Sequence, residues 1–435
     1  MRHSVVSRFR ALPAILLVVL LLAATGCGSA NPVWQAITPD QLLDLSQGEP
    51  IPAEGDTETL EIWGDADPYW LVPFTRMYPT VKVYTREQNA STWRAEWISA
   101  IASGQSADLY VWDETDMDWC VDLPILADLT DTRFDSRDVL DSLTPAEMRL
   151  ATQPGGSVPT MIPQQTHPVL LFYRDDLVRE AGYRMSPEAL GAWLSDGDNW
   201  LALLKAMKEQ GHYGIEWPNH PFLAGSINQS PFDAKYSWKF SQDRYVKAIE
   251  FAVTANREGL VSNINIWSED GKTALNEGRL AMFLGGSWAI DQLPAWAPDT
   301  YGKWRVARQP LGMQAEWAAR WYGIDRNADQ PEAAWHYLRL ATMTARQDQE
   351  KRRNRAHAFY GTQQVYQVAL DAADNREPVS RTPFDQQAAA LMNEELPLLY
   401  ATTIEPGKWL EQVRQRIDAT FGEDLARMRA LAGRD

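Results

Sequence analysis

Apolar and polar positions along the chain predict strands that alternate with helices. The stretch 60–70, LEIWGDADPYW, opens with an apolar run typical of a buried strand, and its Gly, Asp and Pro residues predict where that strand ends. A second strand is predicted over 81–84, Ser91 is expected to cap a helix with one apolar face, and 107–112 predicts a third strand. Strand, helix and strand at this spacing predict a βαβ unit, so this part of the chain is expected to form a parallel sheet.

The rest of the chain continues the alternation. Further strands are predicted over 158–163, 168–173, 213–217, 280–284, 304–309 and 322–325. Helices are predicted over 188–210 and 243–257, and from Pro331 to the end of the chain with three breaks. The expected fold class is therefore α/β.

The loop after the first strand has the chemistry of a sugar-binding loop. Trp63, Tyr69 and Trp70 offer flat apolar faces beside the carboxylates of Asp65 and Asp67. Aromatic faces stack on the CH groups of a sugar ring, and carboxylates accept hydrogen bonds from its hydroxyls. A second acidic loop follows the third strand, and ligands of open α/β sheets bind beyond the carboxyl ends of the strands. Both loops are expected to lie at that edge.

Composition narrows the possible partners. The 435 residues are too many for one ordinary core, so two domains or a two-lobed body are expected. A net charge of −17 repels nucleic acid and anionic lipid, which argues against nucleic-acid binding. The 19 Trp residues exceed what a core needs and favour surfaces that use indole faces; the alternative is a Trp-rich core.

The amino terminus has the pattern of an export signal. Three Arg residues in the first ten positions precede an apolar run over 11–24, and small residues then lead to Cys27. This pattern resembles a bacterial lipoprotein signal, which implies a signal peptide over 1–26, lipid on Cys27, a tether over 27–55 and an extracytoplasmic, membrane-anchored protein. The alternative is an uncleaved membrane anchor, although the apolar run is shorter than a spanning helix requires.

Enzyme motifs are missing from the sequence. It contains no Walker A loop, G-x-G-x-x-G, H-E-x-x-H or G-x-S-x-G motif, and its six His residues are scattered. Neither a cofactor nor a metal ion is therefore expected. If Cys27 carries lipid, Cys120 is an unpaired thiol, expected to be a small buried residue rather than a nucleophile. Glycoside hydrolysis needs only two carboxylates, so it stays open as the enzymatic alternative.

Several motifs occur in an order that resembles one family. W-x(6)-W follows the first strand, SGQSADLYV occupies 103–111, IPQQTHPVLLFYRDDL occupies 162–177, EGRLAMFLGGSWAI occupies 277–290 and PEAAWHYLRL occupies 331–340. Together with the lipoprotein signal, this order resembles the extracellular solute-binding proteins of ABC importers, in the carbohydrate-binding branch that includes maltodextrin-binding proteins. The resemblance extends from Leu60 to the end of the chain.

The resemblance implies the periplasmic-binding-protein fold, with two lobes that each contain a sheet flanked by helices. The chain would cross a hinge between the lobes three times, near 161–166, 301–309 and 345–360. The implied boundaries place 56–163 and 307–348 in the amino-terminal lobe, and 164–306 and 349–435 in the carboxy-terminal lobe.

The family pattern also implies residues that bind sugar between the lobes. Trp63 and Trp288 match aromatic residues that stack on sugar rings, and the alternative for Trp288 is a core residue that anchors its helix. Asp113 matches an acid that accepts hydroxyl protons, or else it caps a helix. Tyr173 matches the aromatic residue of a Y-x-K-D-L motif, and Arg174 departs from that motif, so it either contacts ligand or pairs with an acid.

A further departure from the family pattern is Trp321-Tyr322, where many relatives carry glycine. These bulky residues would narrow the cleft or add a stacking platform, which suggests a short oligosaccharide; the alternative is packing between the lobes. The secondary cleft candidates are Gln164, Gln165, Trp217, Asn219, Trp238 and Tyr360. Tyr69 and Trp70 are given less weight than Trp63 and Asp65, because they lie further into their loop.

The resemblance implies a monomeric receptor that delivers a sugar to the transmembrane permease subunits of an ABC importer. Alternative ligands on the same fold are a phosphorylated polyol, an amine or another small solute. A phosphate would require cationic side chains in the cleft, for which Arg174, Lys303 and Arg320 are the candidates.

Overall fold

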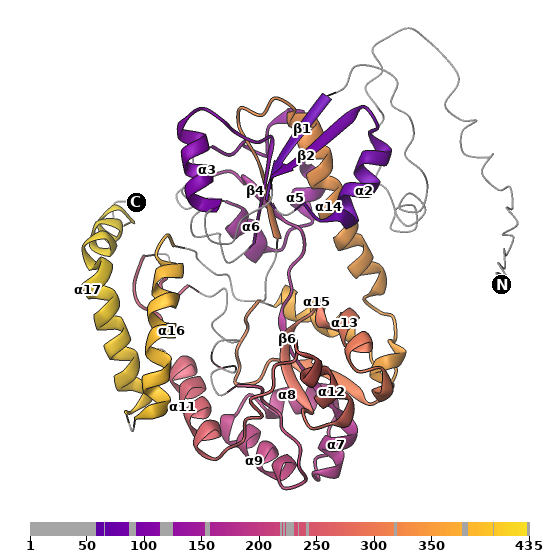
Figure 1. Cartoon of the computed structure of the whole chain (residues 1–435), viewed down its shortest axis with the longest axis vertical. Helices are drawn as coiled ribbons and strands as arrows, with labels where there is room; N and C mark the ends of the chain where they lie inside the picture. The colour runs from indigo at the N-terminus through magenta and orange to yellow at the C-terminus, as the bar shows by residue number, and fades with distance from the viewer. Residues whose placement is uncertain are drawn as a thin grey trace, which may run out of the picture. The chain divides into compact units, whose positions relative to one another are not determined.

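The computed structural model describes residues 58–432, apart from gaps at 65, 87–92, 114–124, 153–156, 218–219, 221, 223–229, 234, 241–242, 317–319, 376–381 and 403 (Figure 1). The expected signal peptide, tether and lipidation site at Cys27 lie outside the described residues, as do Asp65, Cys120 and Asn219. Within the described ranges, no helix is both long enough and apolar enough to cross a membrane.

The first sheet has five strands in the order β2-β1-β3-β8-β4. These strands are β1 (Glu58–Trp63), β2 (Val81–Arg86), β3 (Leu109–Asp113), β4 (Met161–Pro163) and β8 (Arg320–Ile324). β1 pairs in parallel with β2 and with β3, and the helices α2 (Pro68–Met77) and α3 (Trp93–Ala102) make the connections. This is the βαβ arrangement that the spacing predicts. β8 returns from much later in the chain and pairs antiparallel with β3 and β4.

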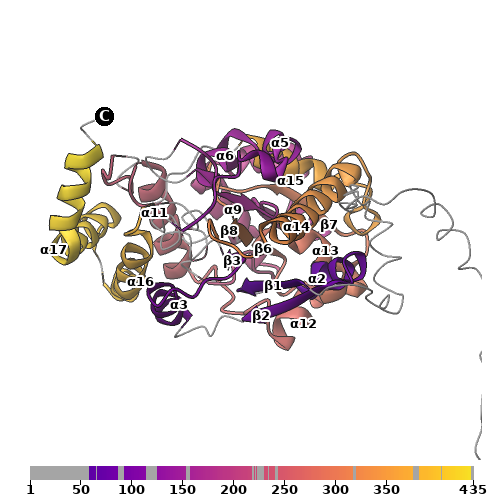
Figure 2. The same cartoon turned by 90° about the horizontal axis from the view of Figure 1, so that it is seen from above.

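Helices cover the first sheet and close two apolar clusters. The helices are η3 (Thr132–Phe134), α5 (Arg137–Asp141), α6 (Pro145–Ala151) and the long α14 (Pro331–Arg352), besides α2 and α3. α14 packs against α2, α5 and β8 (Figure 2), and the rings of Phe74 and Tyr337 meet edge to face at 5.3 Å. On the other cluster, Trp63 of β1 packs against Trp97 of α3 and Tyr110 of β3, with ring centroids 5.7 and 5.9 Å away. Much of the aromatic content of this region is therefore core.

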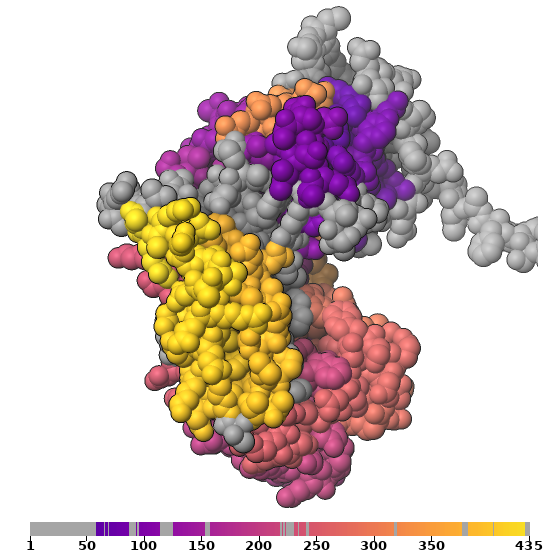
Figure 3. All heavy atoms as spheres, turned by 60° about the vertical axis from the view of Figure 1, so that its left-hand side comes forward, coloured from indigo at the N-terminus to yellow at the C-terminus, as the bar shows by residue number. Residues whose placement is uncertain are grey.

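The second sheet has three antiparallel strands in the order β6-β5-β7. The strands are β5 (Val169–Arg174), β6 (Met282–Gly286) and β7 (Trp304–Arg308). The helices of this region are α7 (Asp175–Glu180), α8 (Pro187–Trp193), α9 (Gly197–Lys208), α11 (Asp243–Arg257), α12 (Glu269–Glu277), α13 (Ala289–Trp296), η4 (Pro298–Thr300), η5 (Ala358–Tyr360), α15 (Val365–Asp374), α16 (Asp385–Ala401) and α17 (Pro406–Ala432). α16 and α17 pack side by side and contact α11, and they form the yellow surface of Figure 3. All six β5 residues are buried, as expected for a central strand.

The chain passes between the two sheets three times. The first passage joins β4 to β5, where the sequence predicts one, and the second joins β7 to β8. The prediction of a passage at 301–309 is wrong, because 304–308 form β7 and pair with β5 in the second sheet. The expected lobe boundary at 307 therefore falls inside a strand, and the passage lies after β7. The third passage follows α14, which contacts β8 of the first sheet and α15 of the second region.

Two local predictions also differ from the structure. The segment after β1 was expected to be a loop, but Asp67 caps α2 by accepting a hydrogen bond from the Tyr69 amide at 2.9 Å, so Tyr69 and Trp70 occupy the first helical turn. The strand expected over 213–217 is reduced to an isolated bridge between Tyr213 and Leu280. A cap and a single bridge depend on contacts that an apolar pattern does not encode.

The turn from β1 into α2 requires glycine at position 64. Gly64 has φ of +119°, and an added Cβ would lie 2.1 Å from the carbonyl oxygen of Val111. We expect Gly64→Ala to lower the free energy of unfolding by about 2–4 kcal/mol, because it adds a backbone clash to an unfavourable φ. Urea denaturation measures this. The matched control is Gly104→Ala, where φ is +80° and the added Cβ meets nothing within 4 Å, so its expected cost is about 1 kcal/mol. Equal losses in the two variants would contradict the role of the clash.

Candidate functional site

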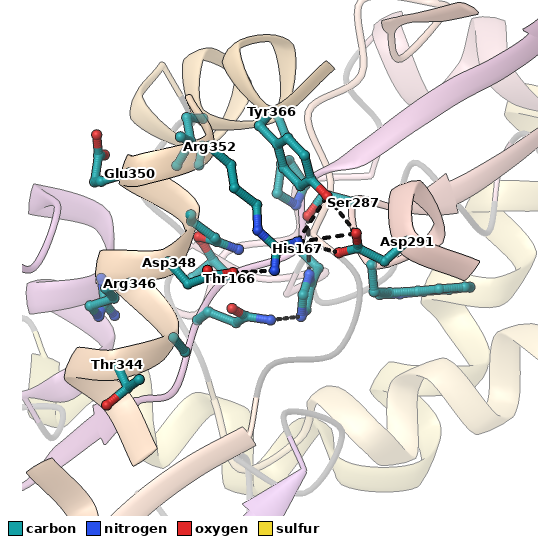
Figure 4. A pocket seen from close by; sticks show the side chains of 18 of the residues that line it. Thr166, His167, Ser287, Asp291, Thr344, Arg346, Asp348, Glu350, Arg352 and Tyr366 are labelled. Atoms are coloured by element: carbon teal, nitrogen blue, oxygen red, sulfur yellow. Dashed lines mark hydrogen bonds and ion pairs between the residues drawn. The ribbon is translucent and has the colours of Figure 1, made fainter. Parts of the chain in front are cut away.

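A cavity of about 570 Å³ lies where elements of both sheet regions meet (Figure 4). Its lining comes from the first turn of α2, the segment leading into α6, the β4–β5 connection, the start of α13, the second half of α14, and α15. Small-molecule sites of proteins commonly have volumes of about 300–1,000 Å³. The cavity is therefore the candidate binding site.

Aromatic faces border the cavity on two sides. Trp288, at the start of α13, is partly exposed, and its ring lies 5.3 Å from that of Trp267 and 6.1 Å from that of Trp296. From the first turn of α2, Tyr69 and Trp70 also line the cavity; their rings meet edge to face at 4.6 Å, and Tyr69 is 57% exposed. Stacking of an apolar ring face is therefore available from both sheet regions.

His167 supplies an orienting polar contact in the β4–β5 connection. Its Nδ1 lies 3.0 Å from Ser287 Oγ, and its Nε2 lies 3.0 Å from the side-chain nitrogen of Gln165. An amide nitrogen can only donate, so this network assigns the proton to Nδ1, which donates to Ser287. Burial lowers the pKa of His167 to about 4, so the ring is neutral at pH 7. The connection is thereby tied to the start of α13.

A charged network joins α13, α14 and α15 at the edge of the cavity. Arg352 donates from Nη1 to Asp291 at 3.1 Å and to the Tyr366 hydroxyl at 3.0 Å, and it also pairs with Asp348. The Tyr366 hydroxyl donates to Asp291 in turn, as Figure 4 shows. Burial, followed by the neighbouring Asp291 carboxylate, raises the pKa of Tyr366. The tyrosine therefore stays protonated and acts as a donor.

A second charged pair anchors α14 to the first sheet region. Arg346 donates to both carboxylate oxygens of Glu147, at 2.9 and 3.1 Å, and to the Pro163 carbonyl at 3.1 Å. Glu147 is 2% exposed and also accepts from the Thr144 amide in the capping box of α6. A bidentate pair with further hydrogen bonds is the geometry that offsets the desolvation of two buried charges.

Six of the ligand residues expected from the sequence are buried in the core and do not line the cavity. They are Trp63, Tyr173, Arg174, Trp321, Tyr322 and Tyr360, each at most 5% exposed. The indole of Trp63 donates to Glu61 at 2.6 Å, Arg174 forms an ion pair with Asp176 at 2.7 Å, and the Tyr360 hydroxyl donates to the Ile290 carbonyl at 2.9 Å. All six side chains are buried away from the described lining, so the structure places them in the core rather than at the cavity. Trp321 and Tyr322 lie in the apolar clusters of the first sheet region, rather than between the lobes as the alternative for them had it.

Of the remaining expected residues, some line the cavity and others do not. Asp67 caps α2 and pairs with Arg320 at 3.1 Å, Asp113 pairs in register with Arg320, and Gln164 lies 3.5 Å from the Tyr322 hydroxyl. Trp217 is 37% exposed and lies outside the lining that the structure describes. Trp288 does line the cavity, and Gln165 does so among the secondary candidates. Trp238 packs against the apolar core of the second region.

The sequence-based interpretation missed several residues of the cavity. Tyr69 and Trp70 were given less weight than Trp63, yet they line the cavity and Trp63 does not. His167 lies within the IPQQTHP segment and Asp291 directly follows the GGSWAI segment, yet neither is among the ligand residues predicted from the sequence. A search for polar residues beside these motifs would have found them. Nothing in the local pattern marks Arg352 or Tyr366, because their relation to Asp291 is tertiary.

The described residues contain no group of three or more His, Cys, Asp or Glu side chains that could hold a metal ion. The cavity instead offers hydrogen-bonding groups between aromatic faces. Two sheet regions joined by three passages, with such a cavity between them, define a protein that binds a small solute.

The comparison with protein families identifies the class. The profile of the bacterial extracellular solute-binding proteins matches residues 49–347, so the chain belongs to this family. Proteins of this family are the extracytoplasmic solute-binding components of ABC importers and are not enzymes. The glycosidase alternative is therefore withdrawn. No curated protein matches the sequence.

Solved structures share the fold at low sequence identity. The galacto-N-biose-/lacto-N-biose I-binding protein of Bifidobacterium longum, in complex with lacto-N-biose, is 15% identical, with a TM-score of 0.66 over 86% of this chain and 99% of that one. The sugar-binding protein MalE of Xanthomonas citri is 18% identical, with a TM-score of 0.66 over 87% and 100% of the two chains. A binding protein of Bifidobacterium animalis in complex with β-1,6-galactobiose is 18% identical, with a TM-score of 0.62 over 85% and 98%.

The environment of His167 predicts a pH dependence of stability. In the unfolded chain a His titrates near pH 6.5, but in the folded protein the pKa of His167 is about 4. Between these values the unfolded state binds the proton and the folded state does not, so stability falls as pH drops from 6.5 to 4, by up to about 3 kcal/mol. Urea denaturation at pH 7.5 and pH 4.5 measures this loss.

The His167→Asn variant separates this effect from that of other residues. Burial also lowers the pKa of His336, to about 3, and that of His357, so the variant should keep part of the loss. We expect the difference between pH 7.5 and pH 4.5 to be smaller in the variant than in the wild type. A loss of the same size in both would show that His167 titrates normally.

Proposed function

We propose that this chain is the receptor of an ABC importer for a sugar or short oligosaccharide, which it binds in the cavity and delivers to the membrane permease. The observation that carries the proposal is that Trp288, Tyr69 and Trp70, from both sheet regions, line one cavity together with hydroxyl and carboxylate groups. A sugar has apolar CH faces and a rim of hydroxyls, and this arrangement complements both. The fold relatives in complex with β-1,6-galactobiose and lacto-N-biose support the choice of ligand class.

The polar lining would fix the orientation of the sugar. Carboxylates such as Asp291 and Asp348 accept hydrogen bonds from hydroxyls, and the Ser287 hydroxyl can donate or accept. These groups come from the second sheet region and from α14, whereas Tyr69 and Trp70 come from the first region. A ligand that contacts both lobes stabilises the arrangement in which the lobes are closer, and the permease would recognise that state.

The first test is a change of one aromatic face. We expect Trp288→Ala to weaken sugar binding by about 10- to 100-fold, or roughly 1.4–2.8 kcal/mol, because it removes a stacking surface. Thermal unfolding with a panel of mono- and disaccharides measures this as loss of the ligand-dependent rise in Tm. Circular dichroism of the variant checks that its fold is retained.

Trp217→Ala is the matched control. This side chain is 37% exposed and does not line the described cavity, so its removal should leave the Tm shift unchanged. Undiminished sugar binding by Trp288→Ala, or an equal loss of the Tm shift in both variants, would contradict the assignment of this cavity as the sugar-binding site. Failure of every sugar in the panel to raise the Tm of the wild type would remove the sugar assignment itself.

We also infer that lipid on Cys27 holds the mature protein at the membrane, after removal of residues 1–26. The basic start, short apolar run and small residues before Cys27 support this. Detergent phase separation of cells expressing the full chain should place the wild type in the detergent phase and Cys27→Ser in the aqueous phase. Recovery of both proteins in the same phase would contradict lipidation at this residue.

A further inference from the structure

The cavity that we assign to the ligand has an unusual distribution of charge. Among the described residues, its lining contains five carboxylates against two guanidinium groups, a net charge of −3, with His167 neutral. The carboxylates are Glu147, Asp291, Asp348, Glu350 and Asp374. A cavity with an excess of one charge attracts ligands of the opposite sign and repels those of the same sign.

The terminal nitrogens of the first guanidinium group are engaged by protein atoms. Those of Arg346 donate to both oxygens of Glu147 and to the Pro163 carbonyl. Its Nε is buried and has no hydrogen-bond partner among the described residues. Drawing Arg346 toward an anionic ligand would leave Glu147, which is 2% exposed, as a buried carboxylate without its counter-ion.

The second guanidinium group is also paired with carboxylates, at a more exposed position than the first. One terminal nitrogen of Arg352 donates to both oxygens of Asp291, at 3.1 and 3.3 Å, and to Tyr366, and the other pairs with Asp348. Figure 4 shows this group of side chains converging from α13, α14 and α15. Arg352 is therefore a cation whose charge two carboxylates already balance.

The other cations considered as phosphate ligands are also paired or distant. Arg174 forms an ion pair with Asp176, and Arg320 forms one with Asp67. Neither they nor Lys303 belong to the lining that the structure describes. Among the described residues, an anionic group in the cavity would thus meet only guanidinium groups that carboxylates neutralise.

We propose that this site selects against anionic sugars, such as sugar phosphates and uronic acids, and accepts uncharged and amino sugars. The selectivity determinant is the pairing of Arg352 with Asp291 and Asp348, which keeps the cation from an anionic ligand. Uncharged hydroxyls and a protonated amine both donate to carboxylates, so they find partners here without breaking an ion pair. This inference rests on the proposed function, because it concerns the ligand of the same cavity.

The first experiment compares ligands that differ only in charge. The wild-type protein is titrated calorimetrically with glucose, maltose, galactose, glucosamine, glucose 6-phosphate, galactose 6-phosphate and glucuronate at pH 7. A neutral sugar that binds should bind at least about 100-fold more tightly than its 6-phosphate, and its amino derivative should bind as tightly or more tightly. A phosphate that binds within threefold of its parent sugar would overturn the charge selectivity but leave the proposed function in place. If no sugar of any charge binds, the proposed function fails and the inference fails with it.

The second experiment releases Arg352. Asp291→Asn and Asp348→Asn in one protein remove its two carboxylate partners, so the ratio of sugar phosphate to parent sugar affinity should rise by about tenfold or more. The matched control is Glu350→Gln, which removes a carboxylate from the same lining but one that pairs with Arg353 at 2.8 Å. Adding Asp374→Asn, whose carboxylate also pairs with Arg353, gives a double control variant. It loses two carboxylate charges, as the Asp291/Asp348 variant does.

The outcomes of the second experiment separate local from general effects. A rise in the ratio confined to the Asp291/Asp348 variant supports Arg352 as the determinant. An equal rise in the Glu350/Asp374 variant would mean that total charge alone excludes anions, and it would overturn the role of Arg352. An unchanged affinity ratio in both variants would also overturn the role of Arg352. Tm values of both variants without ligand show whether each remains folded.

Discussion

The two ion-pair anchors of α14 are the constraint on which the cavity depends. At Arg346 the helix is tied to Glu147 of α6, which packs on β4 of the first sheet, and at Arg352 it is tied to Asp291 of α13. The short length of helix between these arginines forms one wall of the cavity. The same contacts that join the helix to both sheet regions therefore also determine the electrostatic character of the site.

Charge and aromatic surface have separate roles in this arrangement. The charged groups are mostly satisfied by one another, which is typical of charges that hold elements in place. The aromatic faces of Trp288 and Tyr69 remain partly open to the cavity. Affinity would then come mainly from stacking and from hydrogen bonds to hydroxyls, whereas the ion pairs set which ligands are excluded.

Trp63 and Trp288 show why residue type does not assign a binding role. Trp63 ends β1 and Trp288 follows β6, and both fit the family pattern for stacking on sugar. Trp63 packs against Trp97 and Tyr110 and is 1% exposed, whereas Trp288 packs against Trp267 and Trp296 and also lines the cavity. The rings that enclose Trp63 come from α3 and β3, so its burial depends on how these elements pack.

The sequence by itself determined the α/β class, most strand and helix positions, and the family, because periodicity, capping residues and ordered motifs are local properties. Only the tertiary structure decided that β8 enters the first sheet and that the second passage follows β7. It also decided which side chains face the cavity. His167, Asp291, Arg352 and Tyr366 lie on separate segments, and their common chemistry arises from distances that no local pattern specifies.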